Sequence, residues 1–259
     1  LLLCTVLALS ACSNSDRSST TGAESILDML KGNKGPEVEG VEATLLQSAR
    51  KAEQDREYGR PLQFYRQLRD TDKKNTVYLL GVADNLRKTE AYDDAIEGYN
   101  QVLKKSPDHT DALEGKGLAL MAKGETNDSK TTFEQVLKSD SKRWRTLNAI
   151  GVLFVMKGMT EEGLAYYKEA LNAKPNEPAV LNNMGLTLAL DEQFTKSIET
   201  LRRAGAKLDK SDPQRERVDM NLALVYGLSG DMDAAQEVAD RHLDEAALNN
   251  NLGFYAALA

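Results

Sequence analysis

The side chains of this chain that could catalyse a reaction or bind a metal do not form a known catalytic pattern. Its only two histidines, His109 and His242, lie far apart in the sequence. No phosphate-binding glycine loop, serine-hydrolase elbow, HExxH or CxxC motif occurs. The sequence therefore predicts no enzyme, no metal site, no cofactor and no small-molecule substrate. The alternative is an active site assembled from dispersed residues.

Cys12 is the side chain whose surroundings predict a chemical modification. The segment Leu1 to Leu9 is apolar and uncharged, and Ser10, Ala11 and Cys12 follow it. Nine apolar residues are too few to span a bilayer, but they match a signal-peptide core ahead of a cleavage site. The run Leu9-Ser10-Ala11-Cys12 resembles the lipobox of bacterial lipoproteins, which implies a lipid on the Cys12 thiol. The alternative is an ordinary secretory signal with an incidental cysteine.

Asparagines form a second recurring set of polar side chains. Asn is a poor residue for a helix interior because its amide competes for backbone hydrogen bonds. Nevertheless, asparagines recur at the same place in several expected helices: Asn148, Asn182, Asn183, Asn221, Asn250 and Asn251. This recurrence suggests that the amides have a use.

The elements that must position these side chains repeat every 34 residues. A small residue returns at this spacing, at Ala49, Ala83, Gly117, Gly151 and Gly185, and a leucine stands four positions before each. Apolar residues at helical spacing, with Gly124 and Gly158 where the chain must turn, predict a helix–turn–helix unit. Units begin near residues 42, 76, 110, 144 and 178. A slip of four residues around 212–215, interpreted as a longer loop, moves the sixth start to 216, and a partial unit begins near 246.

These columns resemble those of the tetratricopeptide repeat (TPR) family over Glu42 to Ala259, including Pro107 and Pro175 at repeat ends. The sequence departs from that pattern where the early tryptophan of the family is leucine, and at Pro61, where a small residue is usual. The resemblance implies an all-α fold, a TPR α-solenoid of about six helical hairpins plus a terminal helix. A disordered N-terminal tether would precede it.

In TPR arrays the first helices of the hairpins line a concave face, which implies a peptide-binding groove here. Its asparagines would bond to the backbone of an extended partner, and its apolar residues would hold partner side chains. The predicted groove residues are Asn148, Val152, Met156, Asn182, Asn183, Leu186, Leu190, Asn221, Leu224, Asn250 and Asn251. The alternative is that the amides bond to one another across adjacent repeats and stiffen the stack.

Composition divides the chain into three segments. We expect residues 1–11 to be a signal-peptide remnant, residues 12–41 to hold a flexible tether and Cys12, whose lipid the lipobox resemblance implies, and residues 42–259 to form the repeat array. The tether is rich in Ser, Thr, Gly and Asn and cannot bury enough apolar surface to order itself. With 33 basic and 40 acidic residues and a net charge of −7, the chain has no electrostatic footprint for nucleic acid.

The C-terminal units resemble one family more closely. The segments Leu181 to Leu190, Leu201 to Ala204, Asn221 to Leu224 and Asn250 to Tyr255 are similar to the TadD lipoproteins of Tad (Flp) pilus assembly. That resemblance implies a pilotin or assembly factor that binds a pilus secretin, anchored by lipid in the outer membrane and facing the periplasm. The alternatives are a general periplasmic adaptor for cell-wall enzymes or another secretion system, and a cytosolic co-chaperone whose leader is uncleaved.

Overall fold

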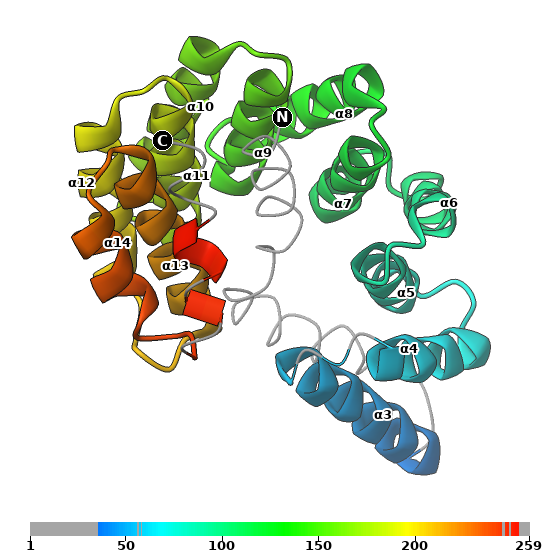
Figure 1. Cartoon of the computed structure of the whole chain (residues 1–259). Helices are drawn as coiled ribbons and strands as arrows, with labels where there is room; N and C mark the ends of the chain where they lie inside the picture. The colour runs from blue at the N-terminus through cyan, green and yellow to red at the C-terminus, as the bar shows by residue number, and fades with distance from the viewer. Residues whose placement is uncertain (1–35, 56, 58, 245–246, 249, 254–259) are drawn as a thin grey trace. The chain divides into compact units, whose positions relative to one another are not determined.

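The computed structural model describes residues 36–55, 57, 59–244, 247–248 and 250–253 (Figure 1). Within these residues there is no strand. The helices are α3 (Pro36–Gln54), α4 (Gly59–Thr71), α5 (Thr76–Lys88), α6 (Tyr92–Leu103), α7 (Thr110–Ala122), α8 (Thr126–Ser139), α9 (Trp144–Met156), α10 (Thr160–Ala173), α11 (Pro178–Leu190), α12 (Phe194–Gly205), α13 (Pro213–Leu228) and α14 (Met232–Ala239). Residues 247–248 and 250–253 are also helical. The predicted all-α fold of six hairpins and a terminal helix is confirmed.

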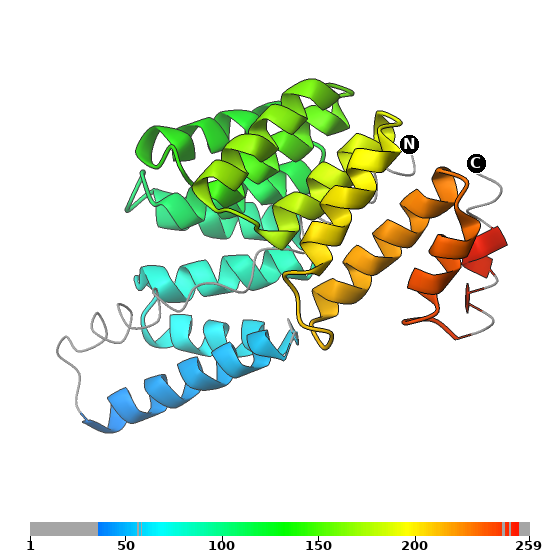
Figure 2. The same cartoon turned by 90° about the vertical axis from the view of Figure 1, so that its left-hand side faces the viewer.

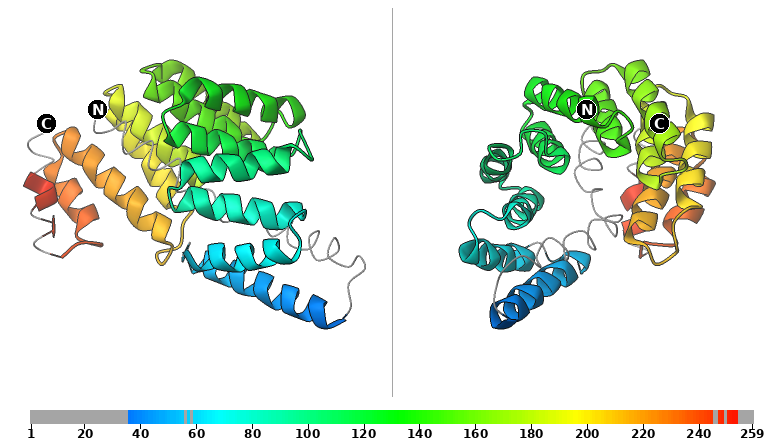
Figure 3. Two further views of the ribbon diagram at one scale, coloured as in Figure 1. Left: turned by 90° about the vertical axis from the view of Figure 1, so that its right-hand side faces the viewer. Right: turned by 180° about the vertical axis from the view of Figure 1, so that it is seen from behind.

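The helices form two compact units, α3–α8 and α9–α14. In both units consecutive helices pair as antiparallel hairpins, which can be followed for α9–α14 in Figure 2 and for α3–α8 in the left view of Figure 3. Within each unit, the second helix of a hairpin packs against its own first helix and against the first helix of the next hairpin. For example, α6 contacts α5 and α7, and α12 contacts α11 and α13.

The predicted column of small residues lies where the two helices of a hairpin touch. Ala49 and Ala83 are fully buried. A Cβ atom on Gly151 would lie 2.6 Å from Cε1 of Tyr167, and one on Gly185 would lie 2.7 Å from Cγ of Leu201. The small residue of the first helix therefore makes room for the large residue that the second helix places at the matching position.

The turns inside the hairpins also follow the repeat. Gly124 and Gly158 have φ values of 83° and 78°, which confirms their predicted left-handed conformation. Gly230 has the same conformation, with φ of 86°. Glu90 and Glu192 occupy the equivalent positions of two other hairpins, with φ of 64° and 56°. The backbone thus repeats even where the residue type does not.

One predicted boundary is wrong, and a second is right in kind but not in position. Helix α3 begins at Pro36, so residues 36–41 are helical rather than part of a flexible tether. Proline fits the first turn of a helix, because its φ is fixed and its missing N–H would be unpaired there in any case. The signal remnant, Cys12 and the rest of the tether lie outside the described residues.

The predicted longer loop at 212–215 exists but lies earlier in the chain. Residues 206–212 join α12 to α13, whereas only residues 174–177 join α10 to α11. Pro213 opens α13, and the side chain of Asp212 caps this helix by accepting a hydrogen bond from the backbone N–H of Gln214 at 2.9 Å. The extra residues therefore lengthen both the connection and the helix, which has 16 residues where α11 has 13. An Asp followed by Pro is a strong helix start, and this local signal overrides the 34-residue spacing.

Candidate functional site

Nine of the predicted groove residues lie on three first helices that neighbour one another. Helix α11 contacts both α9 and α13, so the three form one row within the unit. We call this row the α9/α11/α13 row. It carries Asn148, Val152, Met156, Asn182, Asn183, Leu186, Leu190, Asn221 and Leu224.

Four asparagines of this row form a hydrogen-bonded ladder. Asn221 Nδ2 donates to Asn182 Oδ1 at 2.7 Å, and Asn183 Nδ2 donates to Asn148 Oδ1 at 3.1 Å. The two halves are joined by a longer contact of 3.5 Å between Asn182 Nδ2 and Asn183 Oδ1. The ladder therefore ties α13 to α11 and α11 to α9.

Burial explains why these amides pair with one another. Asn182 and Asn183 have no exposed surface, and Asn148 and Asn221 expose only 6% and 7%. A buried amide that lost its partner would cost about 1–3 kcal/mol. The middle of the ladder therefore serves the packing of the helices, as in the second alternative above. Peptide binding by the row stays a prediction.

The two ends of the ladder retain unused hydrogen-bonding groups. Among the described residues, Asn148 Nδ2 has no acceptor and Asn221 Oδ1 has no donor. An amide carries two donor hydrogens and one acceptor oxygen, so one end of the ladder offers a donor and the other an acceptor. An extended partner segment carries both complementary groups, a carbonyl and an N–H, at different points along its backbone.

The apolar residues of the row divide into two groups. Val152 and Leu186 are fully buried and belong to the core. Met156, Leu190 and Leu224 are partly exposed. These three are the apolar side chains of the row that a partner can contact without prior rearrangement.

The last two predicted groove residues lie apart from the ladder. Asn250 is exposed and Asn251 partly exposed, in the helical residues after α14. Neither forms a hydrogen bond with a described residue. The structure therefore does not bring them into the ladder.

The unit α3–α8 has polar contacts of a different kind on its first helices. Glu53 accepts hydrogen bonds from Asn85 Nδ2 at 2.9 Å and from the Tyr65 hydroxyl at 3.3 Å, and Tyr99 donates to Asp84 at 2.7 Å. Burial, and then the neighbouring carboxylate, raises the pKa of both Tyr65 and Tyr99. A raised pKa keeps a phenol protonated at neutral pH, so these groups act as hydrogen-bond donors that tie helices together.

Sequence reasoning missed a polar cluster around Asp219 in α13. Asp219 is 3% exposed, and it accepts from Arg215 Nε at 2.9 and 3.0 Å and lies 2.9 Å from His242 Nε2. The signal was present in the sequence, because Asp219 occupies the column where Leu147 and Leu181 stand in earlier repeats. A carboxylate in an apolar column must find partners when it is buried.

Two further properties concern the described residues only. No group of three or more His, Cys, Asp or Glu side chains is placed to hold a metal ion there. No helix in this part of the chain has the length and apolar character needed to cross a membrane.

Solved structures with this fold are similar along most of the chain. A tetratricopeptide repeat protein from Parabacteroides merdae ATCC 43184 has a TM-score of 0.67 at 14% identity, with 99% of this chain and 100% of that one covered. A thermophilic TPR protein from Thermus thermophilus has a TM-score of 0.60 at 18% identity, covering 71% and 100%. MamA from Desulfovibrio magneticus RS-1 has a TM-score of 0.52 at 16% identity, covering 67% and 97%. At these identities the likeness concerns the fold.

Sequence comparisons define the family. A search of curated protein sequences found no significant match. Residues 84–216, just over half of the chain, match the family described as "Psidin, N-terminal TPR repeats region". The match lies within the hairpins whose small residues, large partners and left-handed turns recur with the 34-residue period. The chain therefore belongs to this family of tetratricopeptide repeats.

Proposed function

We propose that the chain is a non-catalytic TPR scaffold that binds an extended segment of a partner protein along the α9/α11/α13 row. The observation that carries the proposal is the pair of unused groups at the ends of the asparagine ladder. Asn148 Nδ2 can donate to a partner carbonyl, and Asn221 Oδ1 can accept from a partner N–H. Backbone recognition of this kind holds a partner largely independently of its sequence.

Apolar contacts would supply the rest of the binding free energy. Met156, Leu190 and Leu224 are partly exposed on the same three helices. Methionine adapts to partner side chains of different shape, and full burial of an exposed Met or Leu contributes about 1.5–3 kcal/mol, so these partly buried side chains would each contribute less. The ladder fixes the spacing of the three helices, so the surface is ordered before a partner arrives.

The test removes the donor at the end of the ladder. Asn148→Asp keeps the shape of the side chain and the oxygen that accepts from Asn183, but it removes the free N–H group. The matched control is Asn172→Asp, which makes the same change at an exposed site on α10. The lipidated proteins are used to capture partners from membrane extracts, and captured proteins are quantified by mass spectrometry.

We expect Asn148→Asp to reduce capture of the main partner about tenfold, the effect of one lost hydrogen bond to a peptide group. Asn172→Asp should capture as the wild type does. Circular dichroism melting is used to check that both variants fold. Equal capture by all three proteins, with normal melting, would exclude the row as the binding surface.

We further propose that the scaffold is anchored in a bacterial envelope by lipid on Cys12. The support is the run Leu9-Ser10-Ala11-Cys12 after an apolar segment. Metabolic labelling with palmitate compares the wild type with Cys12→Ala. Label on the wild type alone supports the anchor, whereas an unlabelled wild type removes it.

For the partner, we propose a secretin of a Tad (Flp) pilus, so that the chain is a pilotin or assembly factor at the outer membrane. The support is the similarity of the C-terminal segments, such as Leu181 to Leu190, to the TadD lipoproteins. The second candidate is a general periplasmic adaptor. The capture experiment separates the two, because the first requires secretin among the captured proteins and the second requires cell-wall hydrolases or components of another secretion system.

A further inference from the structure

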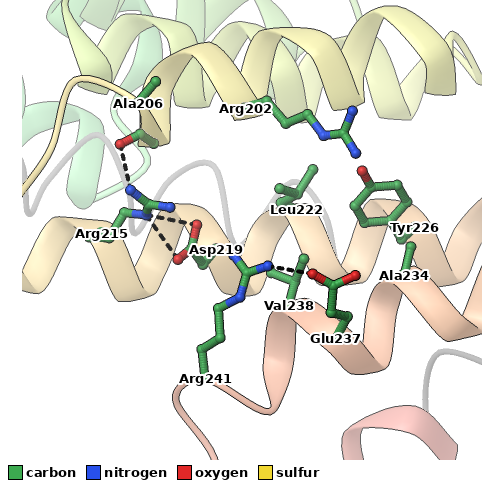
Figure 4. Close-up of a pocket in the computed structure, with 11 residues that line it drawn as sticks. Arg202, Ala206, Arg215, Asp219, Leu222, Tyr226, Ala234, Glu237, Val238 and Arg241 are labelled. Carbon is green, nitrogen blue, oxygen red and sulfur yellow. Dashed lines mark hydrogen bonds and ion pairs between the residues drawn. The ribbon is translucent and has the colours of Figure 1, made fainter. Parts of the chain in front are cut away.

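A small cleft opens between α12, α13 and α14 (Figure 4), and no asparagine of the ladder lines it. Its volume is about 200 Å³, several times that of a water molecule. Polar side chains line much of it, and those that matter here are Arg202, Arg215, Asp219, Tyr226, Glu237 and Arg241. Helices α12, α13 and α14 supply most of the lining, and Ala206 and Arg241 come from the turns after α12 and α14.

Four of these side chains already pair with one another. Arg215 donates to Asp219 at 2.9 and 3.0 Å and to the backbone oxygen of Gly205 at 2.9 Å. Arg241 Nη2 lies 2.9 Å from Glu237 Oε1. Each carboxylate of the cleft is therefore neutralised by a guanidinium.

Two donors remain without an acceptor. The Tyr226 hydroxyl belongs to a residue that is only 5% exposed, and it has no hydrogen-bond partner among the described residues. Arg202 forms no ion pair or hydrogen bond with a described residue, and its Cζ lies 5.6 Å from the centroid of the Tyr226 ring. Figure 4 shows the hydroxyl of Tyr226 directed toward the guanidinium of Arg202.

A buried hydroxyl without a partner is rare in folded proteins and needs an explanation. An acceptor that enters the cleft from solvent would provide one. It would have to be negatively charged to match Arg202, and it would need two oxygens to engage both donors.

We infer that this cleft binds a carboxylate from an acidic side chain of a peptide, held by the Arg202 guanidinium and the Tyr226 hydroxyl. A carboxylate carries a single charge, which matches the single unpaired cation among the described residues that line the cleft. A phosphate dianion would carry a second charge toward Asp219 and Glu237. This site is independent of the groove proposed above, so either can fail without the other.

The test uses the full chain and the acetylated, amidated tripeptide Ala-Glu-Ala as the probe. Binding is followed by NMR of the arginine Nε–Hε and tyrosine signals. We expect saturable shifts at Arg202 and Tyr226, with a dissociation constant on the order of 1 mM, as suits a single charge-assisted contact. The neutral tripeptide Ala-Gln-Ala should bind at least about tenfold more weakly.

Two matched variants separate the cleft from general charge. Arg202→Gln should weaken binding of the acidic tripeptide about tenfold or more, whereas Arg203→Gln, which removes the same charge from the next residue of α12, should not. Tyr226→Phe should also weaken binding, but its melting temperature should not fall, because it removes a buried hydroxyl that has no partner.

Three results would overturn the inference. They are equal loss in the Arg202 and Arg203 variants, equal binding of the acidic and neutral tripeptides, and tighter binding of inorganic phosphate than of the acidic tripeptide. The first would show nonspecific charge attraction. The second would show that the carboxylate is not recognised, and the third that the site prefers another anion.

Discussion

At the scale of single residues, a missing side chain on one helix of a hairpin makes room for a large side chain on the other helix. Gly151 has no side chain because the ring of Tyr167 fills the space beside it, and Tyr167 itself is fully buried. The same arrangement pairs Gly117 with Phe133 and Gly185 with Leu201. Each of these three glycines is thus set by one large partner on the second helix of its hairpin.

Adding one methyl group at this contact should destabilise the fold. A Cβ on Gly151 would lie 2.6 Å from Tyr167 Cε1, so Gly151→Ala forces the two helices apart. We expect a loss of about 1–3 kcal/mol in the free energy of unfolding, measured by urea denaturation. The control is Gly40→Ala in α3, where a Cβ meets nothing within 4 Å and helix propensity should add about 0.5–1 kcal/mol. A stabilised Gly151→Ala protein would contradict this packing.

The carboxylate of Asp219 is a second residue-scale determinant, since it is buried between Arg215 and His242. Asp219→Asn keeps the shape but removes the charge that pairs with Arg215. We expect the free energy of unfolding to fall by about 1.5–3 kcal/mol, the range for hydrogen bonds to charged groups. Asp209→Asn, at an exposed site in the loop before α13, is the control and should change it little. Equal stability of both variants would show that the cluster contributes nothing.

At the scale of helices, the ends and the contacts between rows follow separate rules. The left-handed residue that follows the first helix recurs after α5, α7, α9, α11 and α13, whether it is Gly158 or Glu192. The contacts between first helices, in contrast, depend on side chains such as the paired asparagines of α9, α11 and α13. The position where a helix ends is therefore determined by local backbone conformation, whereas contacts between helices depend on side chains far apart in the sequence.

Replacing the strained residue at a helix end should stabilise the chain. Glu192 is exposed and has φ of 56°, a conformation that is unfavourable for a residue with a Cβ. Glu192→Gly should raise the free energy of unfolding by about 0.5–1 kcal/mol, and thermal or urea denaturation would measure this change. The reverse change, Gly158→Glu, should lower it by a similar amount. If both changes had the same sign, the left-handed conformation would not be the cause.

The asparagine ladder should couple the three first helices energetically. Asn183→Ala leaves Asn148 Oδ1 and Asn182 Nδ2 without partners, so we expect a loss of about 1–3 kcal/mol. In a double-mutant cycle, Asn148→Ala should cost less when Asn183 is already Ala, with a coupling of about 0.5–1.5 kcal/mol. Strict additivity of the two substitutions would show that their hydrogen bond contributes nothing to stability.

At the scale of the whole molecule, phenols buried in both units make stability depend on alkaline pH. Burial and then Glu42 raise the pKa of Tyr78 to about 12, and burial is also the main cause of the raised pKa of Tyr65, Tyr99 and Tyr167. In each case the folded protein holds the phenolic proton more tightly than the unfolded chain, whose pKa is near 10. Folding therefore retains protons that the unfolded chain would release.

The sign of the pH effect follows from this difference. The stabilising contribution of Tyr78 is complete below pH 10 and is lost as the pH rises through 12. We expect helical circular dichroism and tyrosinate absorbance at 295 nm to change together in this range. Tyr78→Phe removes this ionisable group. Once its stability at neutral pH is taken into account, the pH midpoint of alkaline unfolding should therefore be higher in this variant. Full tyrosinate absorbance before any loss of helix would contradict this linkage.

The sequence by itself determined the repeated features, because they depend on local geometry. Helical spacing of apolar residues predicts the hairpins, and the steric freedom of glycine predicts the left-handed turns at Gly124 and Gly158. Glu90 and Glu192 stand at the same position of the repeat as these glycines and share their left-handed conformation, which their residue type alone would not predict. The start of α13 escaped the period, since a local Asp212-Pro213 signal overrode it.

Only the tertiary structure decided which polar groups meet. Asn183 bonds to Asn148 across 35 residues and Asn221 to Asn182 across 39, and His242 reaches Asp219 across 23. Such pairs depend on how each helix is rotated about its axis and on how far it is shifted along its neighbour. A periodic sequence pattern shows which face of a helix is buried, but a small shift along the axis decides whether two amides bond or face solvent. The alternatives for the asparagines were therefore open in the sequence and were separated only by packing.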